Sequence, residues 1–364
     1  MMKKNILLLG ILLFMMASGI SQTNESDKVV LITLDGLRWQ ELFSGADPKL
    51  MANSEYVHDT LKLKKRFWRD SPEERRKALM PFFWSEVTRI GRLHGNRELG
   101  SKVDLTNSMW FSYPGYNEIL TGTADDKRIN SNDKINNPNT TILEIANKDS
   151  NYAGKVAAFA SWDVFPYIVN ESRSGVPVNA GFETAQGPKL TEREKFLNVL
   201  QPQIPSPWGS VRLDAFTHHY AMEYMKKSHP KFVYIAYGET DDFAHDGNYE
   251  AYLNSANNTD KFIEKLWNFV QADPFYKDRT TFIITTDHGR GTEPLETWRH
   301  HGAKIKDAGE VWIIAFGKQI QPVGESQKEE QLYSDQIAPT VLKLLGLSPE
   351  NSDKSAKLLP IFRS

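Results

Sequence analysis

Cysteine is absent from the 364 residues of the chain. This absence excludes disulfide bonds, thiolate metal ligands, a cysteine nucleophile and a lipid anchor on an N-terminal cysteine. A metal site or a covalent mechanism would therefore have to use other side chains.

An excess of charge of one sign is also missing, because 44 lysine and arginine residues face 46 aspartate and glutamate residues. Binding to duplex nucleic acid usually leaves a basic excess, which this composition lacks. We therefore expect an enzyme that acts on small molecules and does not bind duplex nucleic acid.

Long apolar runs are missing after the first 22 residues, so we expect no transmembrane segment. The N-terminus has two early lysines, a short apolar run over 6–16 and then the small residues Ala17, Ser18, Gly19 and Ser21. That order is typical of a secretory signal peptide, predicted here over residues 1–21 with cleavage near Ser21. The mature protein should be secreted or periplasmic.

Several short apolar segments are rich in β-branched or aromatic residues. The predicted buried strands, the second of them with a weaker pattern, are 29–34, 156–160, 232–236, 281–285 and 311–316. A helical pattern at 251–270 lies between two of them, and the alternation predicts an α/β fold with a mostly parallel sheet. The closing run 334–346 is predicted to be a helix capped by Ser334 or Asp335 and ended by Gly346.

Residues 22–364 are expected to form one catalytic domain, because no linker rich in proline, glycine or serine divides them. The stretches near 43–100 and 125–230 are less regular and contain many polar residues, prolines and glycines. We predict that these two stretches are insertions that wall the site.

Acidic and histidine residues follow several of the predicted strands, and open α/β sheets place ligands at the carboxyl ends of their strands. These residues are Asp35 after 29–34, Asp241 and His245 after 232–236, Asp287 and His288 after 281–285, and His300 and His301 further along the chain. Each alone is commonly a turn residue, a cap or a hydrogen-bonded side chain. Together they supply oxygen and nitrogen ligands suited to zinc or a similar divalent ion.

A hydroxyl nucleophile is offered by Ser112, which precedes an expected tight turn at Pro114-Gly115 and a predicted helix. A serine at such a place is often only a helix N-cap. The free N–H groups of a helix N-terminus also favour a bound anion such as phosphate. Ser112 is therefore the predicted nucleophile.

The order of these motifs resembles the alkaline phosphatase superfamily, most of all its type I phosphodiesterases, nucleotide pyrophosphatases and related phosphatases. The motifs are, in chain order, Leu34-Asp35-Gly36, Ser112-Tyr113-Pro114-Gly115, Asp241 with His245, Asp287-His288-Gly289 and His301-Gly302. The closing segment 337–342 is similar to that family's last helix. The resemblance implies an alkaline-phosphatase-like fold, with a mostly parallel central sheet, helices on both faces and inserted cap segments.

The resemblance further implies two divalent metal ions, expected to be zinc. One ion would be held by Asp241, His245 and His301, and the other by Asp35, Asp287, His288 and the Ser112 oxygen. His300 competes with His301 as a ligand, but the family's His-Gly pair favours His301. The implied activity is hydrolysis of a small-molecule or headgroup phosphate ester through a phosphoseryl intermediate at Ser112.

The nucleophile segment departs from that of the nucleotide pyrophosphatases. Their segment resembles Thr-Phe-Pro-Asn-His, whereas this chain has Ser112-Tyr113-Pro114-Gly115-Tyr116. The asparagine that would bind a phosphate oxygen is absent at position 115, which leaves both monoesters and diesters open as substrates. Asn117, Arg38 and Arg173 are candidates for phosphate binding. No feature of the sequence indicates an oligomeric state.

Three alternatives stay open. Sulfatases share the fold, but they resemble a nucleophile motif with an arginine that is missing after Ser112. Cofactor-independent phosphoglycerate mutases are also relatives, although an exported chain would not meet glycolytic intermediates. A metal-binding or glycan-binding protein could have kept the fold and lost the reaction, but every expected ligand position is filled.

Overall fold

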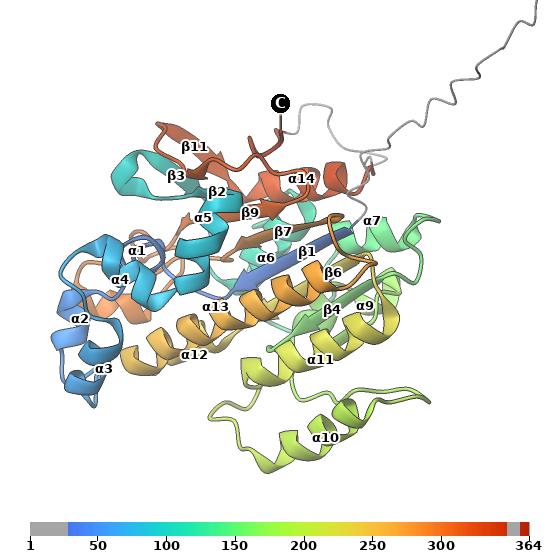
Figure 1. Cartoon of the computed structure of the whole chain (residues 1–364), viewed down its shortest axis with the longest axis horizontal. Helices are drawn as coiled ribbons and strands as arrows, with labels where there is room; N and C mark the ends of the chain where they lie inside the picture. Colours follow the sequence, from blue (N-terminus) through green and yellow to red (C-terminus); the bar gives the residue numbers. More distant parts are fainter. Residues whose placement is uncertain (1–27, 348–356, 364) are drawn as a thin grey trace, which may run out of the picture.

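The structure, a computed structural model, describes residues 28–347 and 357–363, so the predicted signal peptide over 1–21 lies outside the described residues. Its centre is a sheet of eight strands in the order β10-β2-β9-β7-β1-β6-β4-β5. Figure 1 labels β2, β9, β7, β1, β6 and β4 of this sheet. The strands are β1 (Lys28–Leu34), β2 (Gly91–His94), β4 (Val156–Ala160), β5 (Val178–Ala180), β6 (Phe232–Tyr237), β7 (Thr280–Thr285), β9 (Ile313–Gly317) and β10 (Gly324–Glu325). Only β9 runs antiparallel to its neighbours, β7 and β2. The predicted α/β fold with a mostly parallel sheet is confirmed.

A second sheet has three strands in the order β11-β3-β8. Its strands are β3 (Ser101–Asp104), β8 (Glu310–Val311) and β11 (Glu330–Tyr333). The predicted strand 311–316 is divided between the two sheets at Trp312. The Trp312 indole is buried, and its Nε1–H donates to the Leu37 carbonyl at 2.8 Å. Trp312 is thus anchored at the point where the chain leaves β8 of the small sheet and enters β9 of the central sheet.

Helices cover both faces of the central sheet, as predicted. In chain order they are α1 (Trp39–Ser44), α2 (Pro48–Ala52), α3 (Thr60–Phe67), α4 (Pro72–Leu79), α5 (Thr88–Ile90), α6 (Ser112–Thr121), α7 (Ile142–Lys148), α8 (Phe165–Ile168), α9 (Glu171–Ser174), α10 (Glu192–Leu200), α11 (Asp214–Ser228), α12 (Glu239–His245), α13 (Tyr249–Ala272) and α14 (Ile337–Leu344). One face packs against α1 to α4, α11 and α13, and the other against α6, α7, α8 and α14.

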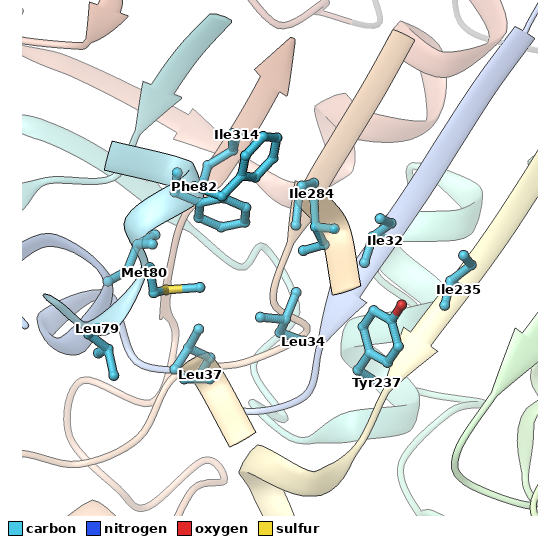
Figure 2. Close-up of a cluster of buried hydrophobic side chains, with 14 of the residues drawn as sticks. Ile32, Leu34, Leu37, Leu79, Met80, Phe82, Ile235, Tyr237, Ile284 and Ile314 are labelled. Carbon is cyan, nitrogen blue, oxygen red and sulfur yellow. The ribbon is translucent and has the colours of Figure 1, made fainter. Parts of the chain in front are cut away.

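The apolar core explains why the central strands are apolar along their whole length. Figure 2 shows part of the cluster on one face, where Ile32, Ile235 and Ile284 come from β1, β6 and β7 and share a cluster with Met80 and Phe82. All seven residues of β1 are buried, because helices cover both faces of the sheet. Strands buried in this way are rigid supports for the residues that follow them.

The closing helix α14 begins later than predicted. Ser334 and Asp335 lie in a 3-10 turn, and Gln336 is the residue before the first turn of α14. The expected caps are therefore wrong, because the 3-10 turn takes up both residues. Gly346 ends the helix as predicted, with a left-handed φ of +69°.

The predicted helix 251–270 is confirmed as part of α13. The ranges 43–100 and 125–230, predicted to be insertions, also supply β2, β4 and β5 to the central sheet. Only parts of each range lie outside the sheet, among them α10, which projects from the body in Figure 1. Within the described part of the chain, no helix has the length and apolar character needed to cross a bilayer.

Candidate metal centre

Three neighbouring strands bring acidic and histidine side chains to one edge of the central sheet. β7, β1 and β6 are adjacent and parallel, so the residues that follow their carboxyl ends meet. Asp35 follows β1, and its N–H extends the ladder by donating to the Tyr237 carbonyl at 2.9 Å. Asp287 and His288 follow β7, and Asp241 lies in α12 directly after β6. These side chains are therefore mounted close to rigid strand ends.

Asp35, Asp287 and His288 form a buried group of possible metal ligands. His288 Nε2 lies 3.2 Å from Asp35 Oδ1 and 3.6 Å from Asp287 Oδ2. The Tyr116 hydroxyl donates to the other Asp35 oxygen at 2.7 Å, and the Gly36 N–H donates to the other Asp287 oxygen at 3.1 Å. Each carboxylate is thus held by one oxygen and presents the other to His288.

Asp241, His288 and His301 form a second group, beside which His245 lies. His301 Nε2 is 3.7 Å from Asp241 Oδ1, and His245 Nε2 is 3.2 Å from Asp241 Oδ2. The two Nε2 atoms of His245 and His301 are 2.9 Å apart. His301 stacks on His288 with ring centres 4.0 Å apart, whereas His300 is exposed. The structure therefore places His301, rather than His300, in the cluster.

The hydrogen bonding of His288 tests whether the first group suits a cation. His288 Nδ1 lies 2.9 Å from the Gly289 carbonyl oxygen, so Nδ1 carries the proton and Nε2 the lone pair. Among the described residues, neither Asp35 Oδ1 nor Asp287 Oδ2 has a hydrogen-bond partner. Three buried acceptors thus face one another, which is costly unless a cation lies between them. Ligand atoms of a tetrahedral ion with ~2.0 Å bonds lie about 3.3 Å apart, close to the observed 3.2 and 3.6 Å.

The pKa values point to the same need for positive charge. Burial, followed by the negative charge of Asp241, raises the pKa of Asp35 well above its usual range. Burial, followed by the charge of Asp35, raises the pKa of Asp287 in the same direction. Burial would also raise the pKa of Asp241, but the charges of Arg290 and His245 hold that pKa well below its usual range. Added cations would favour the charged form of all three carboxylates.

Ser112 is the first residue of α6 and lies beside the first ligand group. Its buried Oγ is 3.4 Å from His288 Nε2. The predicted tight turn at Pro114-Gly115 is wrong, because both residues lie inside the first turns of α6. Proline is tolerated there, since the first N–H groups of a helix have no partner within it. A Cβ on Gly115 would lie 2.1 Å from the Asp287 carbonyl oxygen, so glycine allows α6 to approach the ligands closely.

Three further residues of the centre were not predicted from the sequence. Tyr116 and Arg290 bind the ligand carboxylates of Asp35 and Asp241. Asn132 Oδ1 accepts the N–H of the second residue of α6 at 3.0 Å. Tyr116 could have been found, because it lies four residues after the nucleophile on the same helix face. Arg290 directly follows the Asp-His-Gly motif, whereas nothing in the loop sequence marks Asn132.

The three candidates for phosphate binding are wrong, because their donors are used within the fold. The Arg38 guanidinium is buried and paired with Glu41. Arg173 donates to Glu144 at 2.8 Å and to the carbonyl groups of a neighbouring loop. Asn117 is fully buried, and its amide donates to a backbone carbonyl at 2.8 Å. All three therefore stabilise the loops around α6 and β1 instead.

Two adjoining groups of carboxylate and imidazole side chains, beside a serine at a helix N-terminus, fit the arrangement of a metal-dependent enzyme. The chain belongs to the metalloenzyme superfamily, whose family model matches residues 28–349. Its fold is alkaline-phosphatase-like, as the sequence motifs predicted, and membership of this superfamily implies the use of divalent metal.

Solved structures with a similar fold share little sequence with this chain. The lipoteichoic acid synthase LtaP from Listeria monocytogenes is 13% identical with a TM-score of 0.58, over 90% of this chain and 74% of that one. Murine ectonucleotide pyrophosphatase/phosphodiesterase 5 is 12% identical with a TM-score of 0.54, over 90% of this chain and 97% of that one. At such identities the likeness shows the fold alone.

Curated relatives are similar over a shorter region. A 2,3-bisphosphoglycerate-independent phosphoglycerate mutase from Gracilaria tenuistipitata var. liui is 30% identical over 139 residues, which is 38% of this chain and 26% of that protein. The enzyme of the same name from Wolinella succinogenes is 27% identical over 123 residues, 34% of this chain and 23% of that protein. The matched region spans about a quarter of these relatives' length.

Proposed function

We propose that this chain is an exported phosphoester hydrolase that holds two divalent metal ions, expected to be zinc, and uses Ser112 as its nucleophile. The observation that carries the proposal is the position of Ser112 Oγ, 3.4 Å from His288 Nε2 at the N-terminus of α6. The helix N-terminus favours an anion and the ligand groups favour cations, so a phosphate between them would be stabilised from both sides. Export rests on the predicted signal peptide.

Two sets of side chains would hold the ions. One set is Asp241, His245 and His301, and the other is Asp35, Asp287, His288 and Ser112 Oγ. Ligand atoms lie 2.9 to 3.7 Å apart within each set, and His288 Nε2 also lies 3.6 Å from Asp241 Oδ1 of the other set, so the division itself follows the family resemblance. A set of three protein ligands with one further position free is typical of catalytic zinc. When bound, the ions would supply positive charge for the phosphate, the attacking oxygen and the leaving oxygen.

The chain's own groups would position the reactants. Ser112 Oγ forms a bond to phosphorus while the bond from phosphorus to the alcohol oxygen breaks, and the alcohol leaves with a proton. Water then attacks phosphorus and the bond to Ser112 Oγ breaks, which restores the Ser112 hydroxyl and releases phosphate from a monoester substrate or a phosphate monoester from a diester. Tyr116 fixes one oxygen of Asp35, and Gly115 allows α6 to approach, so Oγ is positioned before the substrate arrives.

Hydrolysis of model esters tests this proposal. The chain from residue 22 onward, loaded with zinc, should cleave p-nitrophenyl phosphate or bis-p-nitrophenyl phosphate. The ratio of the two initial rates would assign a preference for monoesters or diesters. Cleavage of p-nitrophenyl sulfate alone would contradict the proposal and favour a sulfatase, and bound metal without any turnover would favour the inactive alternative.

Substitution of the nucleophile tests the role of Ser112. Ser112→Ala should reduce the rate to background, and phosphorylated Ser112 should be detectable by mass spectrometry after acid quenching of the wild type. Ser85→Ala, at an exposed serine, is the matched control and should keep the wild-type rate. A Ser112→Ala protein that retains the wild-type rate would exclude this serine as the nucleophile.

The curated relatives favour a second candidate, phosphoryl transfer within a phosphorylated hydroxy acid. In that reaction the phosphoserine would return its phosphoryl group to another hydroxyl of the same substrate instead of to water. Incubation with 3-phosphoglycerate separates the two candidates. Formation of 2-phosphoglycerate would favour the mutase, and release of inorganic phosphate alone would favour the hydrolase.

A further inference from the structure

Arg290 lies beside the candidate metal centre with a fully buried side chain. Its Nε donates to the Gly36 carbonyl at 3.2 Å, and its Nη1 donates to the Arg299 carbonyl at 2.7 Å. Its Nη2 donates to the Asp241 carbonyl at 3.0 Å and also pairs with Asp241 Oδ1. One guanidinium thus joins the loop after β1, the start of α12 and the turn before His301.

The three joined segments carry ligands from both proposed sets. These ligands are, in chain order, Asp35, Asp241, His245 and His301. A planar guanidinium directs its N–H groups at fixed angles, so it can hold several acceptors at defined distances from one another. Arg290 therefore constrains the relative positions of the three segments that carry these ligands.

The two oxygens of Asp241 have different partners. Oδ1 is paired with Arg290 and also lies 3.7 Å from His301 Nε2 and 3.6 Å from His288 Nε2, whereas Oδ2 lies 3.2 Å from His245 Nε2. The pairing with Arg290 fixes the rotation of the carboxylate and turns Oδ2 toward His245. A carboxylate held in this way would bind an ion through one oxygen, which leaves a coordination position free for substrate or water.

Gly36 is independent evidence that the loop after β1 is shaped around the contact between Arg290 and Asp241. It has a left-handed φ of +59°, and a Cβ there would lie 2.9 Å from both Arg290 Nε and Asp241 Oδ1. A side chain at position 36 would therefore meet the arginine and the carboxylate at the point where they touch. Glycine leaves the space that the contact needs.

Building on the proposed function, we infer that Arg290 is a positioning residue that holds Asp241 in place for the ion bound by Asp241, His245 and His301. The positive charge of Arg290, acting alone, would have the opposite effect, because a nearby cation repels a metal ion. The sign of the change in zinc affinity therefore separates the two roles. Loss of a positioning residue weakens binding, and loss of a mere charge tightens it.

Zinc titration of the wild type and three variants tests the inference. Each protein competes with a chromogenic chelator for zinc, and elemental analysis counts the bound ions. In Arg290→Met, one of the two ions should bind about 10–100-fold more weakly, while the other is unchanged. Gly36→Ala should also weaken zinc binding, and it can affect both ions because the Gly36 N–H holds Asp287. Arg290→Lys keeps the positive charge but loses the planar guanidinium that binds several acceptors, so its loss of zinc affinity should be intermediate. With cobalt in place of zinc, the visible absorption of the weakened site should change shape.

Arg212→Met is the matched control. Arg212 is also fully buried and donates to two backbone carbonyls, but in segments that carry none of the proposed ligands. This control should bind both ions with wild-type affinity, whatever its melting temperature.

Unchanged or tighter zinc binding by Arg290→Met would overturn the inference. If that variant does not fold, wild-type affinity in both Arg290→Lys and Gly36→Ala would overturn it as well. A wild-type protein that binds fewer than two ions would contradict the proposed function instead, so the two failures are distinguishable.

Discussion

Mild acid should destabilise this protein through His218, a residue of α11 whose side chain is completely buried. The ring stacks on Phe262 with centres 4.4 Å apart, and its Nδ1 lies 3.1 Å from the Tyr237 hydroxyl. Burial, followed by the positive charges of His219 and Lys265, lowers the pKa of His218 from 6.5 to about 2. The folded protein therefore keeps this ring neutral at pH values where an exposed histidine is charged.

The sign of the effect follows from the difference between the folded and unfolded states. The unfolded chain takes up a proton on His218 near pH 6.5, and the folded chain does so only near pH 2. The stabilisation is complete above pH 6.5 and is lost as the pH falls from 6.5 towards 2. Each pH unit is worth about 1.4 kcal/mol, so the loss at pH 5 is about 2 kcal/mol. That is a large share of the net stability of about 5–15 kcal/mol found for folded domains.

Urea unfolding at pH 7 and at pH 5, with metal chelated throughout, measures this loss. His218→Gln removes the titrating ring and keeps an amide for the Tyr237 hydroxyl. Between pH 7 and pH 5, the free energy of unfolding of this variant should therefore fall by about 2 kcal/mol less than that of the wild type. His58→Gln changes an exposed histidine, and its free energy of unfolding should fall by as much as that of the wild type. The pKa of His219, which burial lowers to about 4, affects all three proteins equally. Equal losses in the wild type and His218→Gln would refute the reasoning.

Two further perturbations test the metal centre. Gly115→Ala should lower kcat about 100-fold and the free energy of unfolding by about 1–3 kcal/mol, because the new Cβ would lie 2.1 Å from the Asp287 carbonyl oxygen and displace Ser112. The control Gly209→Ala, with no neighbour within 4 Å of its Cβ, should leave both quantities unchanged, and a normal kcat in Gly115→Ala would contradict the close approach of α6. Removal of metal by a chelator should lower the melting temperature, and zinc at 1,000 times its Kd should restore about 4 kcal/mol. An identical melting temperature with and without zinc would show that the carboxylates need no ion.

The central strands were predictable because they are buried on both faces. β1, β6 and β7 contain almost only apolar or β-branched residues, so their pattern stands out from the rest of the sequence. β2, β3, β5, β10 and β11 have only two to four residues each and several polar side chains, so no periodic signal marks them. They pair because the larger strands and the helices already hold the chain in place.

The candidate site was predictable to the extent that it depends on strand ends. Asp35, Asp241 and Asp287 follow three strands that prove to be neighbours, and residues placed in this way meet at one edge of a parallel sheet. The place of His301 followed from the resemblance rather than from spacing, since a loop with a 3-10 helix over Leu295–Arg299 separates it from β7. Tyr116 was missed because it contacts a ligand and not the ion itself.

The arginines near the metal centre show why the positive charge that would bind a phosphate was harder to predict than the metal ligands. Arg38 and Arg173 looked like phosphate ligands, but the fold pairs them with Glu41 and Glu144. Arg290 is paired in the same way with Asp241. A buried carboxylate left without a partner is costly, so internal acceptors compete with a substrate for every arginine that the fold encloses. Under the proposed function, positive charge for the phosphate then comes from the bound ions and from the N–H groups at the start of α6. The ions would therefore hold the substrate as well as activate it, and the nucleophile would attack a phosphate already fixed by the groups that hold Ser112.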